Sequence, residues 1–361
     1  MSIHVIQPVV PHYRVPFFSK LASVNSDIHF YASEKDDIDV VSVNDEVFSY
    51  IKLGKIISLF GFSWQLGITK ILLKLKSKDI MVINGNPRYL STLFIALIAR
   101  LIGVKIVWWG QGWSANTTTN SFRLRAYLMR FADAVLLYTD DEKTLLHPYV
   151  SEKKLYALNN GIENKYICKY AEVYDPKSRP KAIIFIGRLT DKSNLQVLLK
   201  AISVLKDSTC LHVIGAGPNS ELYKAEAHAL GITDKVIFHG ELLSEEDIAR
   251  VANQSKVFVY PGNVGLSLIH AFNYGLPAVI HSDKSRHMPE ASCHIPQSTG
   301  KVFEYGNYIS LSNIICKIIN DDDMLSFYSL ECKNIVKDNY NIDSMCLRFQ
   351  EVITSVQHGK S

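Results

Sequence analysis

The stretch with the clearest chemical signature is a loop that follows a short apolar run in the second half of the chain. The run Val257–Tyr260 is broken by Pro261, and helical spacing begins after Gly265. The free N–H groups and the positive dipole end of a helix bind phosphate. The sequence therefore predicts a phosphate site formed by Gly265, Leu266 and Ser267.

One histidine lies about a turn inside this predicted helix. From that position the ring of His270 could reach the ribose of a nucleotide. A packed or solvent-facing histidine explains the residue equally well.

Two cationic side chains follow another apolar run. Ala182–Ile186 leads into Gly187 and Arg188, with Lys192 shortly after them. Open α/β sheets bind ligands at the carboxyl ends of their strands, and the arginine fork matches a diphosphate. We expect Gly187, Arg188 and Lys192 to contact a diphosphate; a surface arginine in a connecting loop is the alternative.

Two glycines after a third run would let a ligand approach the backbone closely. Gly215 and Gly217 follow Cys210–Ile214, but the third spaced glycine and the acidic residue of a dinucleotide site are missing. An NAD site is therefore not predicted. With His239 from the next run, these residues are expected to pack near a base and ribose.

Polar and aromatic residues also follow the apolar runs of the first half. At the carboxyl ends of strands they would be well placed to touch a sugar, whereas packing or helix capping by asparagine are the alternatives. The candidates are Tyr13, Arg14, Asn86, Gln111 and Trp113.

Short β-branched runs alternate with longer helical patterns along the whole chain, which predicts parallel α/β sheets. At 361 residues the chain is long enough for two domains. The polar stretch 172–179 separates two series of runs and predicts a linker. The runs are His4–Gln7, Ile28–Ala32, Ile80–Asn84, Lys105–Trp109, Ala134–Tyr138, Ala182–Ile186, Cys210–Ile214, Val236–His239, Val257–Tyr260 and Ala278–Ile280.

Composition narrows the class of protein further. The chain is 47% hydrophobic and 20% charged with a net charge of +4, as in a globular protein. Its six cysteines form no Cys-x-x-Cys pair, so neither a zinc site nor a disulfide framework is predicted. Because no secretory signal is visible after Met1, we expect a cytoplasmic protein.

Positive charge is concentrated between residues 50 and 130, where Asp79 is the single acidic residue. Within this region, 51–78 mixes lysines with aliphatic and aromatic residues, as in helices that rest on an anionic membrane. A solvated basic face is equally compatible, and nucleic acid is less favoured because no binding motif accompanies the charge. The apolar stretch 89–110 contains Arg100 and Lys105 and is interpreted as a buried helix, a turn and a strand.

Several of these motifs occur together in the order and spacing of one enzyme family. Through about residues 155–305 the sequence resembles the family-4 GT-B glycosyltransferases. The motifs are Asn160-Gly161-Ile162, Gly187-Arg188-Leu189, Gly215-Ala216-Gly217-Pro218, Gly265-Leu266 before Tyr274-Gly275-Leu276-Pro277, and Met288-Pro289-Glu290 before Thr299-Gly300-Lys301.

The sequence also departs from the family pattern. The Glu-x7-Glu pair of the family falls on Gly262 and His270, and its lysine after Gly-Arg-Leu falls on Ser193. The resemblance suggests that His270 holds the donor ribose and that Lys192 substitutes for the missing lysine.

The resemblance implies a GT-B fold, in which two Rossmann-like domains face each other across a cleft. We expect an acceptor-binding domain at 1–175, containing Tyr13, Arg14, Asn86, Gln111 and Trp113. A nucleotide-sugar-binding domain is expected at 176–361, with terminal helices able to cross back to the first. Arg188, Lys192 and Glu290 are the expected catalytic residues.

The implied reaction is a metal-independent, retaining transfer without a cofactor. The donor would be a GDP- or UDP-sugar, and the acceptor a lipid-linked glycan in bacterial surface polysaccharide synthesis, such as O-antigen or capsule. Residues 50–130 would contact the inner face of the plasma membrane. The acidic run 321–323 is interpreted as a solvated turn and helix cap, not as a metal site.

Two alternatives share this fold. A nucleotide-sugar epimerase needs carboxylates for proton chemistry, and the predicted site offers only Glu290. A catalytically silent partner protein is favoured by the missing glutamates, whereas the retained Arg188 argues against it.

Overall fold

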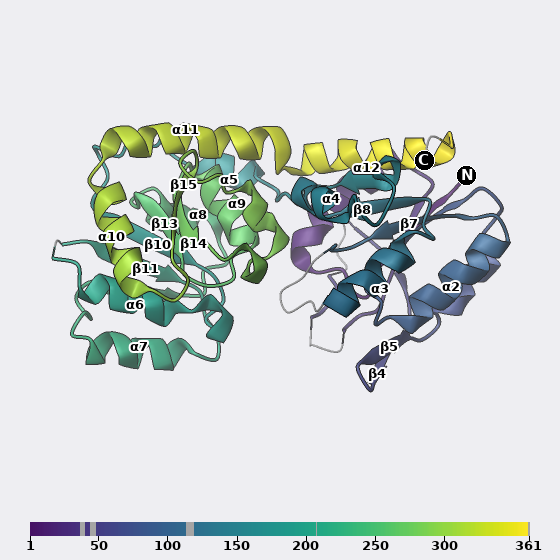
Figure 1. Cartoon of the computed structure of the whole chain (residues 1–361), viewed down its shortest axis with the longest axis horizontal. Coiled ribbons are helices and arrows are strands. Elements are labelled where there is room, and N and C mark those ends of the chain that lie inside the picture. Colours follow the sequence, from purple (N-terminus) through teal and green to yellow (C-terminus); the bar gives the residue numbers. More distant parts are fainter. Residues whose placement is uncertain (37–39, 44–47, 113–118, 207, 360–361) are drawn as a thin grey trace. The chain divides into compact units, whose positions relative to one another are not determined.

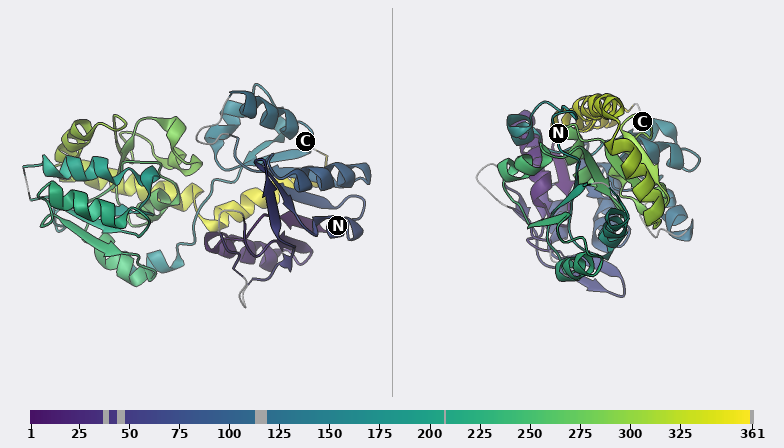
Figure 2. Two further views of the ribbon diagram at one scale, coloured as in Figure 1. Left: turned by 90° about the horizontal axis from the view of Figure 1, so that it is seen from below. Right: turned by 90° about the vertical axis from the view of Figure 1, so that its left-hand side faces the viewer.

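The computed structural model describes residues 1–36, 40–43, 48–112, 119–206 and 208–359 (Figure 1). By their internal contacts, these residues form two compact units. The first contains the described residues of 1–163 and 342–359, and the second contains 164–341. Each unit is built on a parallel sheet flanked by helices (Figure 2), so the predicted α/β class with two Rossmann-like sheets is confirmed.

The first unit contains a seven-stranded sheet in the order β3-β2-β1-β6-β7-β8-β9, and every neighbouring pair is parallel. The order reverses between β1 and β6, which is where such sheets bind ligands. The strands are β1 (Ile3–Ile6), β2 (Ile28–Ala32), β3 (Ile51–Lys52), β6 (Ile80–Asn84), β7 (Lys105–Trp109), β8 (Ala134–Leu137) and β9 (Leu155–Ala157).

Alternating side chains of this sheet supply two apolar cores. Val82 and Val107 pack with α1 (Val15–Val24) and with the C-terminal helix α12 (Ile342–Gln357). Met81 and Ile106 pack on the other face with residues of α2 and α3. Helix α12 therefore completes the first unit, because its apolar stripe covers a face that the sheet would otherwise expose. The remaining helices of this unit are α2 (Leu90–Leu101), α3 (Thr119–Met129) and α4 (Asp140–Leu146).

The second unit contains a six-stranded parallel sheet in the order β12-β11-β10-β13-β14-β15, which reverses between β10 and β13. Its strands are β10 (Ala182–Ile186), β11 (Cys210–Ile214), β12 (Val236–Gly240), β13 (Val257–Tyr260), β14 (Ala278–His281) and β15 (Gly300–Phe303). Its helices are α5 (Lys165–Tyr170), α6 (Leu195–Ser203), α7 (Ser220–Ala229), α8 (Glu245–Ala252), α9 (Leu266–Asn273), α10 (Tyr308–Ile319) and α11 (Asp322–Asn339).

The polar stretch around residue 175 packs on the second unit. The Tyr174 hydroxyl donates to the carbonyl of Lys256 at 2.7 Å, and the buried Arg179 guanidinium donates to the carbonyl of Ser255 at 2.8 Å. The units therefore divide between 163 and 164, whereas the sequence analysis placed the division near 175. The difference arises because polar side chains of this stretch bind backbone carbonyls of the segment between α8 and β13.

The expectation of surface α-helices at 51–78 is wrong, and the expectation for 89–110 is right except for the burial of its helix. Residues 51–78 form β3, the hairpin of β4 (Ile56–Leu59) and β5 (Phe62–Gln65), and the 3-10 helix η2 (Ile68–Leu73) instead of membrane-surface α-helices. Phe60 and Gly61 turn the chain with φ values of 50° and 79°. Residues 89–110 form the expected helix α2, a turn at Gly103 and the strand β7. Helix α2 is not buried all round, however, since Leu97 and Leu101 are 63% and 80% exposed. No helix of the described residues is long and apolar enough to cross a membrane.

Candidate active site

The loops that follow β10 and β11 are joined by backbone hydrogen bonds at the carboxyl edge of the second sheet. The Leu189 amide donates to the carbonyl of Ala216 at 3.0 Å. A Cβ atom added at Gly215 would lie 1.9 Å from the Gly187 carbonyl oxygen, and one at Gly217 would lie 2.3 Å from that of Leu189. These two glycines are thus required for the contact between the loops, whether or not a ligand also approaches them.

Arg188 and Lys192 are exposed near the point where the strand order of this sheet reverses, between β10 and β13. Arg188 follows β10, and Lys192 lies in the 3-10 helix η4 (Asp191–Ser193). No acidic side chain of the described residues forms an ion pair with either of them. The Lys192 carbonyl accepts a hydrogen bond from the Asn263 amide at 2.9 Å, which ties this loop to the one before α9. Both cations are therefore available to an anionic ligand at the switch point.

The close contact of these two loops explains two departures from the family pattern. A Cβ at Gly262 would lie 2.1 Å from the Lys192 carbonyl oxygen, so a glutamate does not fit there. Ser193 is fully buried, and its hydroxyl donates to the carbonyl of Thr190 at 2.6 Å. A lysine at position 193 would point into this contact, whereas the side chain of Lys192 faces solvent.

The start of α9 combines an uncapped helix end with a nearby carboxylate. Gly265 is the N-cap, no side chain caps the helix, and Leu266 and Ser267 form the first turn. Glu290, in the 3-10 helix η6 (Pro289–Cys293), is 6% exposed, and its Oε2 lies 3.7 Å from the position of a Cβ on Gly265. A carboxylate beside the positive helix end partly satisfies it. The helix end alone therefore offers less positive charge to an anionic ligand than an end without a neighbouring carboxylate.

His270 is held by a carboxylate that the sequence reasoning missed. Its Nε2 lies 2.8 Å from Oε1 of Glu245, and the Tyr274 hydroxyl donates to the same oxygen at 2.5 Å. Burial raises the pKa of Glu245, but the hydrogen bonds from His270 and Tyr274 outweigh it and lower this pKa overall. Glu245 begins α8, where an acidic residue is typical of ordinary helix capping, so no local signal identified it.

His239 faces a second histidine on the adjacent strand. Its Nε2 lies 3.0 Å from Nδ1 of His212, and the rings are stacked with their centroids 5.2 Å apart. Burial lowers the pKa of both imidazoles. With both rings neutral, one imidazole donates a hydrogen bond to the other across this contact. The contact of His239 with a nucleotide stays a prediction.

Two stacked histidines contact the loop before α9 through the side chain of His287. The rings of His281 and His287 lie 3.7 Å apart. His287 accepts from the Val264 amide through Nδ1 at 3.4 Å and donates from Nε2 to the carbonyl of His281 at 2.9 Å. Burial lowers the pKa of His281 to about 3, so this support is uncharged at neutral pH.

In the first unit, Arg14 is the most enclosed of the predicted acceptor residues. It is 9% exposed, and its guanidinium carbon lies 4.6 Å from the centre of the Trp109 ring and 5.3 Å from that of Tyr138. Such stacking holds a cation in one orientation. Its neighbour Tyr13 is 50% exposed.

The Gly110–Gly112 loop is held by two charged residues that the sequence reasoning missed. The buried Glu142 accepts from the Gly112 amide at 2.7 Å, and Arg125 donates to the Gln111 carbonyl at 3.2 Å. Gln111 is half-buried in this loop, which follows β7 at the carboxyl edge of the sheet. Trp113 lies outside the described residues.

Asn86 follows β6 at the same carboxyl edge. Its Oδ1 accepts from the backbone amide of Arg88 at 3.1 Å. This local turn explains the asparagine without a ligand, so its contact with an acceptor stays a prediction.

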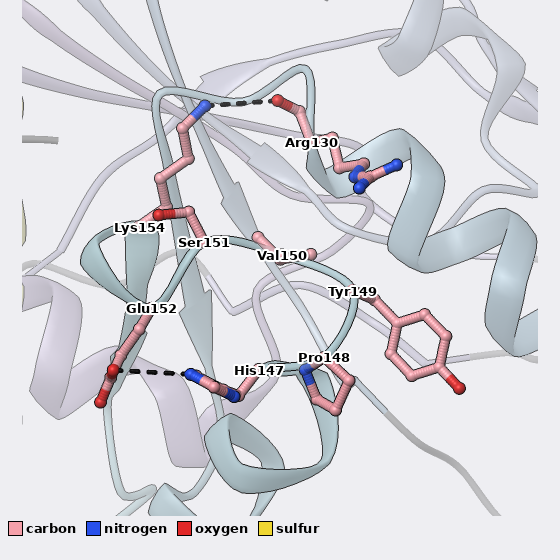
Figure 3. A pocket seen from close by; sticks show the side chains of 8 residues that line it. All are labelled: Arg130, His147, Pro148, Tyr149, Val150, Ser151, Glu152 and Lys154. Carbon is pink, nitrogen blue, oxygen red and sulfur yellow. Dashed lines mark hydrogen bonds and ion pairs between the residues drawn. The ribbon is translucent and has the colours of Figure 1, made fainter.

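A surface hollow of about 400 Å³ lies elsewhere in the first unit (Figure 3). It is near the amino ends of β8 and β9, away from the carboxyl edge where ligands bind such sheets. Lys154 crosses it to donate to the carbonyl of Arg130 at 3.3 Å, and His147 faces Glu152 at 3.6 Å. None of the predicted site residues lines this hollow.

The acidic run 321–323 has structural partners. Asp321 caps α11 by accepting from the Met324 amide at 2.9 Å, and Asp322 pairs with the buried Lys256 at 2.7 Å. Across the part of the chain that the structure describes, no three His, Cys, Asp or Glu side chains gather as metal ligands would.

The amino-acid sequence is similar to those of known glycosyltransferases. Residues 169–333 match the sequence model of the family described as glycosyl transferases group 1. An uncharacterized glycosyltransferase of Methanocaldococcus jannaschii is 22% identical over 353 residues, which span 92% of this chain and 78% of that protein.

Solved structures show the same fold over nearly the whole chain. HepE of Anabaena, crystallised with UDP, is similar with a TM-score of 0.74 at 14% identity, covering 98% of this chain and 100% of that one. The lipopolysaccharide outer core galactosyltransferase WaaB is similar with a TM-score of 0.70 at 16% identity, covering 98% and 99% of the two chains.

The two sheets and these likenesses define the class of protein as a glycosyltransferase with the GT-B fold. The match of residues 169–333 to the glycosyl transferases group 1 family agrees with the resemblance seen in the sequence. The matched region contains every predicted catalytic and donor-binding residue, from Gly187 to Glu290.

Proposed function

We propose that this chain transfers a sugar from a UDP- or GDP-sugar to a lipid-linked glycan during bacterial surface polysaccharide synthesis, with retention of anomeric configuration. The observation that carries the donor side is the pair of exposed cations, Arg188 and Lys192, at the switch point beside the start of α9. The UDP bound to HepE favours a uridine nucleotide within this proposal.

The chemical role of this site is to stabilise the leaving group. Cleavage of the anomeric bond places negative charge on the departing nucleoside diphosphate, and preorganised donors lower the barrier to that step. Arg188 and Lys192 supply the charge, and the amides of Leu266 and Ser267 supply hydrogen bonds. Glu290, already beside the helix start, accepts from hydroxyl groups of the sugar. The proposal requires neither a metal nor a cofactor.

His270 takes the place of the family's second glutamate through the support of Glu245. When Nε2–H donates to Glu245, Nδ1 is left as a hydrogen-bond acceptor. A ribose hydroxyl needs such an acceptor, and a carboxylate at this position would provide the same function. Glu245 is therefore proposed to act as a positioning residue for His270.

A thermal-shift panel tests the donor site. UDP, GDP, dTDP, ADP and CMP are compared on the wild type, Arg188→Ala and the control Arg250→Ala, which removes an arginine with a 68% exposed side chain on α8. A ligand at a hundred times its Kd stabilises the native state by about 2.7 kcal/mol. We expect one diphosphate to raise the Tm of the wild type and the control but not of Arg188→Ala. Equal responses in all three proteins would exclude this site.

A silent nucleotide-binding protein is the second candidate, because the structure leaves no room for a glutamate at Gly262. For a silent protein, we expect a nucleoside diphosphate to raise the Tm, but we expect no release of that nucleoside diphosphate from any nucleotide sugar. An epimerase would instead release the nucleotide and an altered sugar in the absence of an acceptor. Chromatography of the products from UDP- and GDP-sugars separates these three outcomes.

A further inference from the structure

The β4–β5 hairpin exposes its apolar face to solvent. Cross-strand partners in an antiparallel pair lie on the same face. Ile57 pairs with Trp64 and Leu59 with Phe62, and these four side chains are 54%, 38%, 65% and 50% exposed. Phe60, at the tip, is 91% exposed. A continuous apolar surface thus runs from the body of the hairpin to its end.

The opposite face of the hairpin contains the polar residues Ser58, Ser63 and Gln65, of which the two on β5 are buried. Ser63 and Gln65 are 5% and 1% exposed. The Ser63 hydroxyl lies 2.9 Å from that of Ser58, and the Gln65 side-chain amide donates to the Ser33 hydroxyl at 2.9 Å. In a hairpin adapted to water the polar face would lie outward. The reversed pattern means that apolar side chains stay exposed although the fold has an inward face available.

Helix α2 continues the apolar surface. Leu90, Phe94, Leu97 and Leu101 have the spacing of one helix face and are 41%, 44%, 63% and 80% exposed. The Trp64 and Phe94 rings meet with their centroids 5.9 Å apart, so hairpin and helix form one patch. Figure 1 shows the hairpin projecting beside α2. We call the nine side chains of this patch the hairpin–helix face: Ile57, Leu59, Phe60, Phe62, Trp64, Leu90, Phe94, Leu97 and Leu101.

The charges around the hairpin–helix face are positive. Lys55 precedes β4, and Lys70 lies in η2, which packs against α2. Both lysines are exposed, and no acidic side chain of the described residues pairs with them. Asp79 is buried and accepts from the Ser2 amide at 2.8 Å, so it does not offset this charge.

We propose that the hairpin–helix face docks the protein on an anionic lipid bilayer. The apolar side chains would enter the region between head groups and acyl chains, with Phe60 leading, while Lys55 and Lys70 contact lipid phosphates. Helix α2 has 12 residues and would lie along the surface. A protein partner is less favoured because Lys55 and Lys70 lie beside the apolar patch and no acidic side chain of the described residues pairs with them. This inference rests on the proposed function, since it states where a lipid-linked acceptor would be met.

Vesicle flotation of the full-length protein tests the docking. Vesicles of phosphatidylcholine alone are compared with vesicles that contain 30% phosphatidylglycerol, a composition chosen as about one charge per three lipids. The variants are Phe60→Asn, whose new residue tolerates the positive φ of 50°, and Lys55→Gln/Lys70→Gln. Leu243→Asn is the control, because Leu243 is 88% exposed in the second unit. Unchanged Tm values verify that the variants fold.

We expect the wild type and Leu243→Asn to float with anionic vesicles. With neutral vesicles, both proteins should stay at the bottom of the gradient. Phe60→Asn should lower the partition coefficient at least tenfold, and the double lysine variant should lose most of the preference for anionic lipid. Absence of wild-type binding, or full binding by Phe60→Asn, would overturn the inference. A wild-type dimer in sedimentation that Phe60→Asn dissociates would instead assign the patch to a second copy.

Nucleotide binding by the same variants separates this inference from the proposed function. Phe60→Asn should keep the full UDP- or GDP-induced rise in Tm. If the nucleotide binds but vesicles do not, docking is rejected and the donor site stands. If vesicles bind but no nucleotide does, docking stands and the glycosyl-transfer proposal is rejected.

Discussion

Replacing His270 by glutamate introduces the residue that the family pattern has at this position, yet the structure predicts that it harms the protein. In the native chain, Nε2 of His270 lies 2.8 Å from Oε1 of Glu245, and the two side chains are 14% and 22% exposed. A carboxylate at position 270 would therefore stand against an existing carboxylate in a largely enclosed place. Two unit charges about 4 Å apart interact by up to about 4 kcal/mol at an effective dielectric constant of 20.

Relaxation and partial protonation reduce this repulsion, but the hydrogen bond between His270 and Glu245 is also lost. A hydrogen bond to a charged group contributes about 1.5–3 kcal/mol. We expect His270→Glu to lower the free energy of unfolding by roughly 2–4 kcal/mol at pH 7.5. The double variant His270→Glu/Glu245→Gln should recover most of this loss, because the side-chain amide introduced at position 245 would donate to the new carboxylate.

Urea unfolding followed by circular dichroism measures these differences, and UDP titration shows whether the double variant still binds nucleotide. Acidification should narrow the gap between His270→Glu and the wild type, since protonation of one carboxylate removes the repulsion. A loss below about 0.5 kcal/mol, within the range of ordinary surface substitutions, would refute the reasoning. So would a double variant no more stable than His270→Glu.

The remaining predictions concern the loops and the buried cation of the second unit. Gly262→Glu should lower the free energy of unfolding by at least about 2 kcal/mol and abolish nucleotide stabilisation in the thermal-shift assay, because its Cβ would lie 2.1 Å from the Lys192 carbonyl oxygen. Arg179→Met should cost about 2–3 kcal/mol in urea unfolding, because the buried carbonyl of Ser255 loses its donor; an unchanged midpoint would contradict this role. The lowered pKa of Glu245 means that its stabilising contribution is present above the unfolded value of about 4.3 and is lost as pH falls through the folded pKa. Glu245→Gln should therefore flatten the acid limb of the stability profile, and an identical limb in both proteins would count against this assignment.

Local patterns in the sequence were enough to predict much of the second unit. The alternation of apolar runs identified the strands on both sides of its switch point, and glycine with helix spacing located the start of α9. Arg188 and Lys192 were found because residues just after a strand in a parallel sheet lie at its ligand edge. These features depend on a few consecutive residues, so they can be recognised without knowing the tertiary structure.

Contacts between distant residues were decided only by the tertiary structure. Glu245 meets His270 across 25 positions, and only the tertiary fold brings the first residue of α8 to a side chain of α9. The amphipathic spacing of 51–78 fitted surface helices, but the Phe60-Gly61 turn and the buried Gln65 formed a hairpin with its polar side inward. Periodicity shows that one side of an element is apolar, whereas the surrounding fold determines which side is covered. By itself, the sequence determined the kind of fold and the position of the loops that we propose bind phosphate. Tertiary packing decided which carboxylate supports His270 and which apolar face remains exposed.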